Sequence, residues 1–202
     1  MLKKYLSIVM MCASLQSQLI SGEQIDDFNY INVDGQQLKT SHDIVSTIQV
    51  NSDFNPLEPY RYQAEFHRRP FNVSLMTYIK DEHLLAIHAE SLPDKSGVLD
   101  YSYMQPVTLF GIKMFYREHC PKLTEQDVSG AKDLAYFRAN GFDFSPRVHL
   151  QQYFLHSVSG NSEIVITIAT RYDERNYSCE PGKQKPERLN SFINSFDIAE
   201  NK

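Results

Sequence analysis

The stretch Arg147–Ala169, RVHLQQYFLHSVSGNSEIVITIA, decides the fold class expected from this sequence. Apolar and polar residues alternate in both of its halves, and the polar residues 159–163 separate them. In the first half Val148, Leu150, Phe154 and Val158 share a face, and in the return half Ile164, Ile166 and Ile168 share a face. A period of two on either side of a short turn predicts an antiparallel hairpin, with Gln152 and His156 on the same face as the first apolar set.

Several segments with the same alternation precede this hairpin. They span residues 28–33, 36–40, 44–50, 61–67, 71–79 and 84–91. Asp34-Gly35 lies between the first two and predicts a tight turn, because Asp-Gly accepts positive φ at both turn positions. Residues 92–123 are apolar in part but have no clean period, so strand and buried helix are not distinguished there.

Two helices are expected after these strands. Thr124 can cap a helix that ends at Gly141, and Leu189, Phe192, Ile193 and Phe196 have the i, i+3, i+4, i+7 spacing of a helix that docks on a core. Strands joined by short turns pair antiparallel, and helices must cover the sheet. We therefore expect an α+β fold, a single antiparallel β-sheet flanked by two or three helices.

The N-terminus is typical of an exported protein. Lys3 and Lys4 precede an apolar run at 6–13, and small and polar residues follow at 14–22. This pattern predicts a signal peptide over 1–22, a single α+β domain over 23–202, and a periplasmic or secreted location. The alternative is an amphipathic N-terminal helix of a cytosolic protein.

Charge and hydropathy exclude several partner classes. The 202 residues carry 20 basic and 25 acidic side chains, for a net charge of -5. Cleavage of the signal peptide would remove Lys3 and Lys4, which leaves 18 basic and 25 acidic side chains and a net charge of -7. Nucleic acid and anionic membranes need a basic surplus, so neither is an expected partner. No run reaches the roughly 18 apolar residues of a membrane span, so no transmembrane segment is expected after cleavage.

Cleavage would also remove Cys12 and leave two cysteines. An even pair in an exported chain predicts a Cys120–Cys179 disulfide, which closes a loop of 59 residues (179 − 120). The alternative is a catalytic thiol at Cys120 beside His119. A thiolate needs a positioned imidazole or a helix N-terminus, and a neighbour in sequence usually points elsewhere, so the disulfide is favoured.

The order of elements over residues 30–198 and the ending Phe192-Ile193-Asn194-Ser195-Phe196 resemble the PsbP/Mog1-like group. That group consists of small antiparallel sheets flanked by helices, and many of its bacterial members are exported. The resemblance implies a binding or accessory role, and it assigns no functional residue.

Motifs for nucleotide binding, serine hydrolysis and zinc proteolysis are missing, and neither cofactor nor metal is expected. The densest set of metal-ligand types is His83 and His88 with Glu82 and Glu90, of which His83, His88 and Glu90 are the candidate ligands. His88 and Glu90 would lie on one side of a strand about 7 Å apart, but zinc needs three or four ligands, so a solvated strand face is preferred. A small hydrolase that uses these three residues as metal ligands, or His119 and Cys120 as a thiol pair, is the alternative function.

The favoured function is a non-catalytic exported module that binds a protein or small ligand. Residues 92–123 are too long for an ordinary connection, and such segments are often functional. We expect this segment to pack on the sheet and to leave Tyr101, Tyr103, Phe110 and Tyr116 as a partner-binding patch. The alternatives are that it forms one more core element, or that the protein is a subunit of an envelope complex.

Overall fold

The computed structural model describes residues 28–172, except 45, 52, 67, 98 and 146, together with the backbone of 196–200. Three sequence predictions fall outside these residues: the signal peptide at 1–22, Cys179 as a disulfide partner, and residues 189–195 of the closing helix.

A large antiparallel sheet forms the centre of the fold, in the order β4-β6-β7-β11-β10-β9-β8, with β5 also paired to β6. Its strands are β4 (Asn55–Pro56), β5 (Tyr60–Phe66), β6 (Arg69–Lys80), β7 (His83–Ser91), β8 (Gln105–Leu109), β9 (Ile112–His119), β10 (Arg147–His156) and β11 (Ser162–Tyr172). The predicted hairpin at 147–169 is confirmed, since β10 and β11 pair from Arg147↔Tyr172 to His156↔Glu163.

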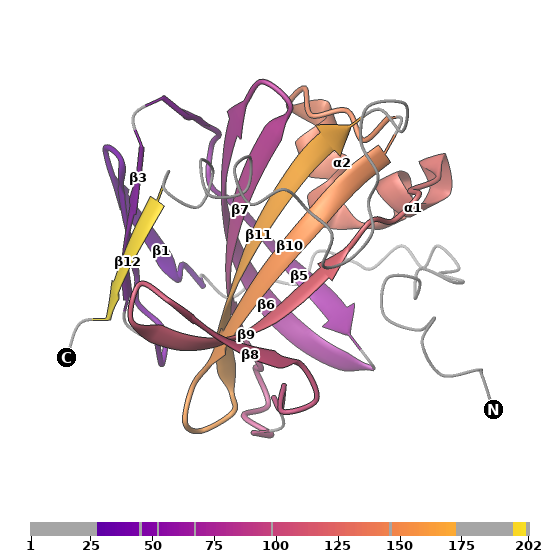
Figure 1. Cartoon of the computed structure of the whole chain (residues 1–202). Helices are drawn as coiled ribbons and strands as arrows, with labels where there is room; N and C mark the ends of the chain where they lie inside the picture. The colour runs from indigo at the N-terminus through magenta and orange to yellow at the C-terminus, as the bar shows by residue number, and fades with distance from the viewer. Residues whose placement is uncertain are drawn as a thin grey trace.

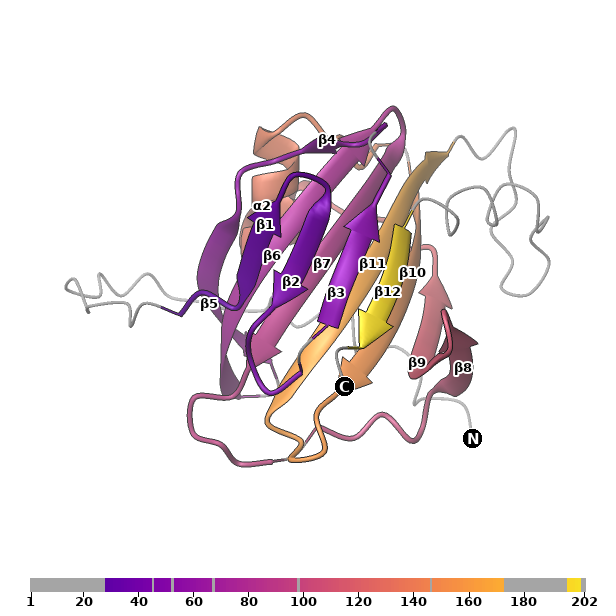
Figure 2. The same cartoon turned by 90° about the vertical axis from the view of Figure 1, so that its left-hand side faces the viewer.

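A second antiparallel sheet of four strands, in the order β1-β2-β3-β12, covers one face of the large sheet (Figure 2). Its strands are β1 (Ile31–Asp34), β2 (Gln37–Thr40), β3 (Ser46–Val50) and β12 (Phe196–Glu200). Leu38 and Ile48 of this sheet are fully buried against Met76, Ile87 and Ile166 of the large one. The apolar positions of the two sheets thus make one continuous core.

Two short helices, α1 (Glu125–Gly130) and α2 (Lys132–Ala139), cover the opposite face of the large sheet, as Figure 1 shows. Thr124 caps α1 as predicted, in a capping box with Asp127. The single predicted helix is broken at Ala131, which has an extended backbone (φ −104°, ψ 127°). A second core lies under this layer and includes Phe137 and Val128 of the helices.

The expected single sheet flanked by two or three helices is wrong. The protein is mostly β, and its two sheets pack face to face, with helices only on the outer face of the large one. Strands β6 and β7 are buried along most of their length on both faces, so each face needs its own cover. Phe196, expected at the end of a helix, begins β12, which pairs with β3.

The undetermined segment 92–123 contains an irregular loop followed by the β8–β9 hairpin. The loop, residues 92–104, lies against the β10–β11 turn, where Leu92 and Leu99 donate backbone hydrogen bonds to Asn161 and Gly160 (2.8 and 3.2 Å). The approach is tight, because a Cβ on Gly97 would stand 2.8 Å from the Ser159 carbonyl oxygen. The segment therefore contributes an edge hairpin and a fixed loop over one end of the sheet.

Candidate functional site

Polar side chains gather on the helix-side face of the large sheet, across β7, β11, β10 and β9. Residues paired in register share a face, so the register defines three rows. The acid row is His156, Glu163 and Glu90; the aromatic row is Phe115, Phe154, Val165 and His88; the arginine row is Arg117, Gln152 and Thr167.

Glu90 and Glu163 of the acid row stand directly opposite each other on β7 and β11, and we call them the acid pair. Their exposed fractions are 5% and 4%. Burial raises the pKa of Glu163 to about 7, and burial and the Glu163 charge raise the pKa of Glu90 well above its usual value. Two buried carboxyls this close cannot both ionise easily, so the pair retains a proton near neutral pH.

The 92–104 loop closes over the acid pair through Tyr101, whose hydroxyl donates a hydrogen bond to Oε2 of Glu163. The Tyr101 ring packs on Phe154, with centroids 4.9 Å apart, and also lies beside His156 (6.1 Å). Burial and the Glu163 charge raise the pKa of Tyr101, so the phenol stays a donor. The loop thus fixes both the acid pair and the aromatic row.

His88 lies beside the acid pair and under α2. Its Nε2 is 3.7 Å from Oδ2 of Asp133, in the first turn of that helix. Its Nδ1 is buried and has no hydrogen-bond partner in the described part of the chain. Tyr62 faces the same acids, and its pKa is raised by burial and by the charges of Asp133 and Glu90.

The metal-ligand set of the alternative function, His83, His88 and Glu90, is not assembled. His88 and Glu90 do share a face, but both are buried, so the expectation of a solvated face was wrong. His83 lies on the opposite face at the start of β7, where its Nδ1 is 3.1 Å from the Thr170 hydroxyl. Among the described residues, no group of three or more His, Cys, Asp or Glu side chains is arranged to hold a metal ion.

Arg117 of the arginine row is half-buried and donates one hydrogen bond to Oε1 of Gln152, which in turn donates to Thr167 (3.2 Å). Its guanidinium lies over the Phe154 ring, 5.5 Å from the centroid. Within the described residues no carboxylate lies at salt-bridge distance from Arg117, and its Nε is buried without an acceptor. Burial lowers the pKa of Arg117.

His119 follows on the same face of β9, two residues further along the strand. Its pKa falls to about 4, chiefly through burial and then through the nearby charges of Arg117 and His149, so the ring is neutral at pH 7. Its Nδ1 is buried and has no partner among the described groups. Residues i and i+2 of a strand share a face and lie about 7 Å apart, so the side-chain nitrogens of Arg117 and His119 lie in the same region.

The structure brings together only part of the predicted binding patch. Tyr101 and Tyr103 are neighbours, with ring centroids 6.5 Å apart, and Tyr103 is 67% exposed. Phe110 is 37% exposed but lies at the far end of β8, in the β8–β9 turn. Tyr116 faces the small sheet and is half-buried, so Phe110 and Tyr116 do not extend the surface around Tyr103.

Tyr116 belongs to a separate polar group on the face of the large sheet that packs against the small one. Glu118 accepts a hydrogen bond from the Tyr116 hydroxyl (3.1 Å), and its Oε1 lies 2.8 Å from Nε2 of His149. Gln151 donates to the Tyr116 oxygen (2.9 Å). Burial lowers the pKa of His149. These contacts satisfy one another, and Cys120 follows this group directly at the end of β9.

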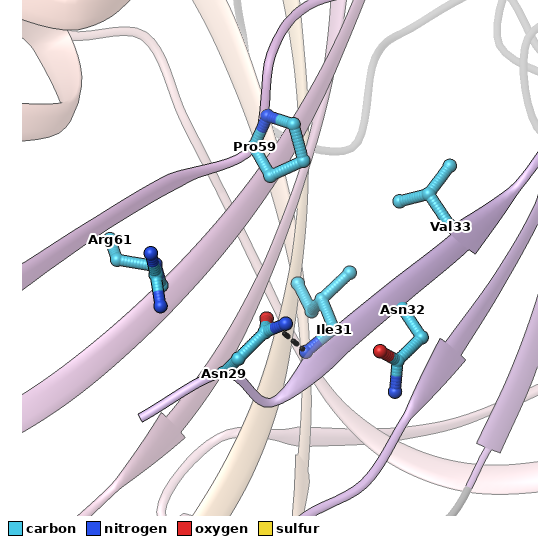
Figure 3. Close-up of a pocket in the computed structure, with 6 residues that line it drawn as sticks. All are labelled: Asn29, Ile31, Asn32, Val33, Pro59 and Arg61. Carbon is cyan, nitrogen blue, oxygen red and sulfur yellow. Dashed lines mark hydrogen bonds between the residues drawn. The ribbon is translucent and has the colours of Figure 1, made fainter. Parts of the chain in front are cut away.

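A shallow hollow of about 450 Å³ lies elsewhere, between β1 and β5 (Figure 3). Asn29, Asn32, Val33, Pro59 and Arg61 line it and are exposed, together with the buried Ile31. It contains none of the residues of the three rows. The polar groups converge at the 92–104 loop, and we take that region as the candidate site.

Sequence reasoning singled out Tyr101, Tyr103 and Glu90 of this region but missed Glu163 and Arg117. Both lie at polar-face positions of alternating strands, Glu163 at the start of the return strand and Arg117 two residues after Phe115. For Arg117 the local signal is the aromatic Phe115 two residues before it, whereas Glu163 lies between Asn161 and Val165 on its face and has no such signal. Which strands are neighbours is set by tertiary pairing, which alternation does not reveal.

Comparisons with known proteins assign no relative to this chain, because no protein family, curated protein or solved structure matches it. The likeness to the PsbP/Mog1-like group therefore stays a hypothesis. In the part of the chain that the structure describes, no helix has the length and apolar character needed to cross a membrane.

Proposed function

We propose that the protein is an exported, non-catalytic binding or accessory protein, and that it captures a protein or small ligand at the surface around Tyr103. The observation that carries this is the exposure of Tyr103, a large aromatic side chain that is 67% accessible beside the half-buried rings of Tyr101 and Phe115. Aromatic side chains at the edge of a rigid polar network are typical anchors of binding surfaces.

The fixed loop supports this function. Tyr101 is tied to Glu163, and Leu92 and Leu99 are tied to the β10–β11 turn, so Tyr103 projects from a segment that is already ordered. A preorganised surface loses less conformational entropy on binding than a loop that must first become ordered. The exported location rests on the N-terminal pattern at 1–22.

Replacing Tyr103 with alanine tests the proposal. We expect Tyr103→Ala to weaken capture of partners from the protein's own export compartment at least tenfold and to change the melting temperature by less than about 2 °C, because the side chain is exposed. Phe66→Ala is the matched control, since Phe66 is also an exposed aromatic (46%) but belongs to β5.

Captured molecules are identified by mass spectrometry. The dissociation constant of each is then measured with the wild type, with Tyr103→Ala and with Phe66→Ala. A partner that binds the wild type and Phe66→Ala equally, and Tyr103→Ala at least tenfold more weakly, supports the proposal. Equal binding to all three proteins places the binding surface elsewhere and overturns it.

A further inference from the structure

We infer that Arg117 and His119 form a binding subsite for a carboxylate, on a ligand whose apolar body lies against Phe115 and Tyr103. This inference rests on the proposed binding function and names the chemistry of its ligand. Nothing in the sequence patterns pointed to these two residues as a pair.

Arg117 has no carboxylate at salt-bridge distance among the residues that the structure describes. A half-buried guanidinium has lost part of its hydration, and a charged group in that position is normally paired with an acid. Here one nitrogen binds a neutral amide, Gln152, and Nε has no acceptor in the described residues. Because the residue is only partly buried, the outer end of the guanidinium can still be reached from solvent.

A second polar side chain with a buried, unpartnered atom lies next to Arg117 among the described residues. His119 lies next to Arg117 on the same face of β9, and its Nδ1 is likewise buried without a partner among the described residues. Its ring is neutral at pH 7 and can donate from one nitrogen. Buried polar atoms without partners are uncommon in native proteins, so two neighbouring ones mark a polar region that lacks an acceptor. The buried Nε and Nδ1 are out of reach of solvent, so the carboxylate would accept from the outer guanidinium N–H groups of Arg117 and from Nε2–H of His119.

The residues around Arg117 restrict the size and charge of the ligand. Phe154 lies under the guanidinium, and Phe115 and Tyr101 continue this aromatic wall toward the exposed Tyr103. The planar fork of an arginine matches a carboxylate. The acid pair on the same face and the mature charge of -7 disfavour a polyanion. A monoanion that carries an apolar or aromatic group fits this surface.

The test uses phenylacetate as the probe, with phenylacetamide, phenethylamine and inorganic phosphate as comparisons. Binding to the whole mature protein, without the signal peptide, is followed through the Nε–Hε NMR signals of arginine and through the melting temperature. We expect saturable binding of phenylacetate that shifts the Arg117 signal, with at least tenfold weaker binding of the amide and of the amine.

Arg117→Gln should weaken phenylacetate binding at least tenfold. The matched control is Arg171→Gln, because Arg171 of β11 also lies over an aromatic ring, 5.8 Å from the centroid of Phe142, and it should stay within twofold of the wild type. His119→Gln should weaken binding severalfold. Arg117→Lys should restore only part of the affinity, since a lysine lacks the planar fork.

Three results overturn the inference: equal binding of amide and carboxylate, equal loss in both arginine variants, or phosphate binding as tight as phenylacetate. If Arg117→Gln does not fold, the wild-type Arg117 signal and the ranking of the four probes still decide. The proposed function fails separately, through undiminished partner capture by Tyr103→Ala. Loss of that capture without phenylacetate binding refutes this inference alone.

Discussion

At the scale of single residues, the acid pair is the feature that costs stability. Glu163 is 4% exposed and lies opposite Glu90, and the charges of His88 and His156 act on it. The pKa of the Glu163 carboxyl is raised from 4.5 to about 7. Between these two pH values the carboxyl stays protonated in the folded state but is ionised in the unfolded state. Stability from this group is therefore complete below pH 4.5 and falls as the pH rises to 7.

Glu163→Gln should remove this loss, because a glutamine keeps the shape and the acceptor for Tyr101 but carries no charge. We expect the variant to be more stable than the wild type by about 1–3 kcal/mol at pH 8 and nearly equal to it at pH 4. Urea unfolding at several pH values measures this difference.

The control for this experiment is Glu65→Gln, an exposed glutamate on β5, which should leave the pH dependence unchanged. If Glu163→Gln lowers the free energy of unfolding at pH 8, the folded state uses an ionised Glu163, and the acid pair does not cost stability. Keeping a destabilising pair is typical of residues retained for function.

At the scale of elements, the 92–104 loop depends on one close approach. Gly97 has φ +64°, and a Cβ there would stand 2.8 Å from the backbone oxygen of Ser159. Gly35 has a similar φ of +59°, but a Cβ there would meet nothing within 4 Å. The two glycines therefore share the conformational penalty of substitution and differ only in the contact.

We expect Gly35→Ala to cost about 1 kcal/mol and Gly97→Ala about 3 kcal/mol, because only the second must also separate the loop from the β10–β11 turn. Gly97→Ala should in addition quicken hydrogen exchange at the Leu99 amide, which bonds to Gly160. Equal costs for the two variants would show that the loop is not held by this contact.

The distance along the chain between paired elements explains which of them the sequence could predict. The β10–β11 hairpin, the β1–β2 hairpin and the Thr124 cap depend on residues close in the chain, and all three are present. The second sheet is different, since β12 pairs with β3 across about 150 residues of chain. A period of two identifies a strand but not its partner, so a single sheet was the simplest interpretation.

The candidate site was only partly predictable for a related reason. Glu90 and Glu163 become a pair only because β7 lies beside β11, and Arg117 faces Gln152 only because β9 lies beside β10. Tyr101 and Tyr103 were found because aromatic clustering is visible in the sequence. Phe110 and Tyr116 are close to these tyrosines along the chain but not in space. The β8–β9 turn carries Phe110 away from them, and the alternation of faces turns Tyr116 toward the small sheet.

At the scale of the whole molecule, the topology favours the predicted Cys120–Cys179 disulfide. Strands β9 and β11 are both antiparallel to β10, so they run parallel to each other. Both therefore finish at the same end of the sheet, near the start of β10. Cys120 follows the end of β9, and residue 179 is seven residues beyond Tyr172, the end of β11. Two strand spacings are about 10 Å, and seven residues reach at most about 23 Å, so the cysteines can meet.

This bond would tie the chain between β11 and β12 to the end of β9 in the large sheet. Closing a loop of 59 residues (179 − 120) contributes about 4 kcal/mol through the entropy of the unfolded chain. We therefore expect a double Cys120→Ser, Cys179→Ser variant to lose about 2–4 kcal/mol in urea unfolding, and the wild type to lose the same when reduced.

Intact mass of protein from its export compartment should show a chain that begins after residue 17–22 and lacks two hydrogens, and non-reducing peptide mapping should join Cys120 to Cys179. Reduction should leave the double variant unchanged, which separates this bond from other effects of the reductant. A chain that starts at Met1 with both thiols freely alkylated contradicts both predictions. It would also reopen the alternative of a thiol hydrolase that uses His119 and Cys120.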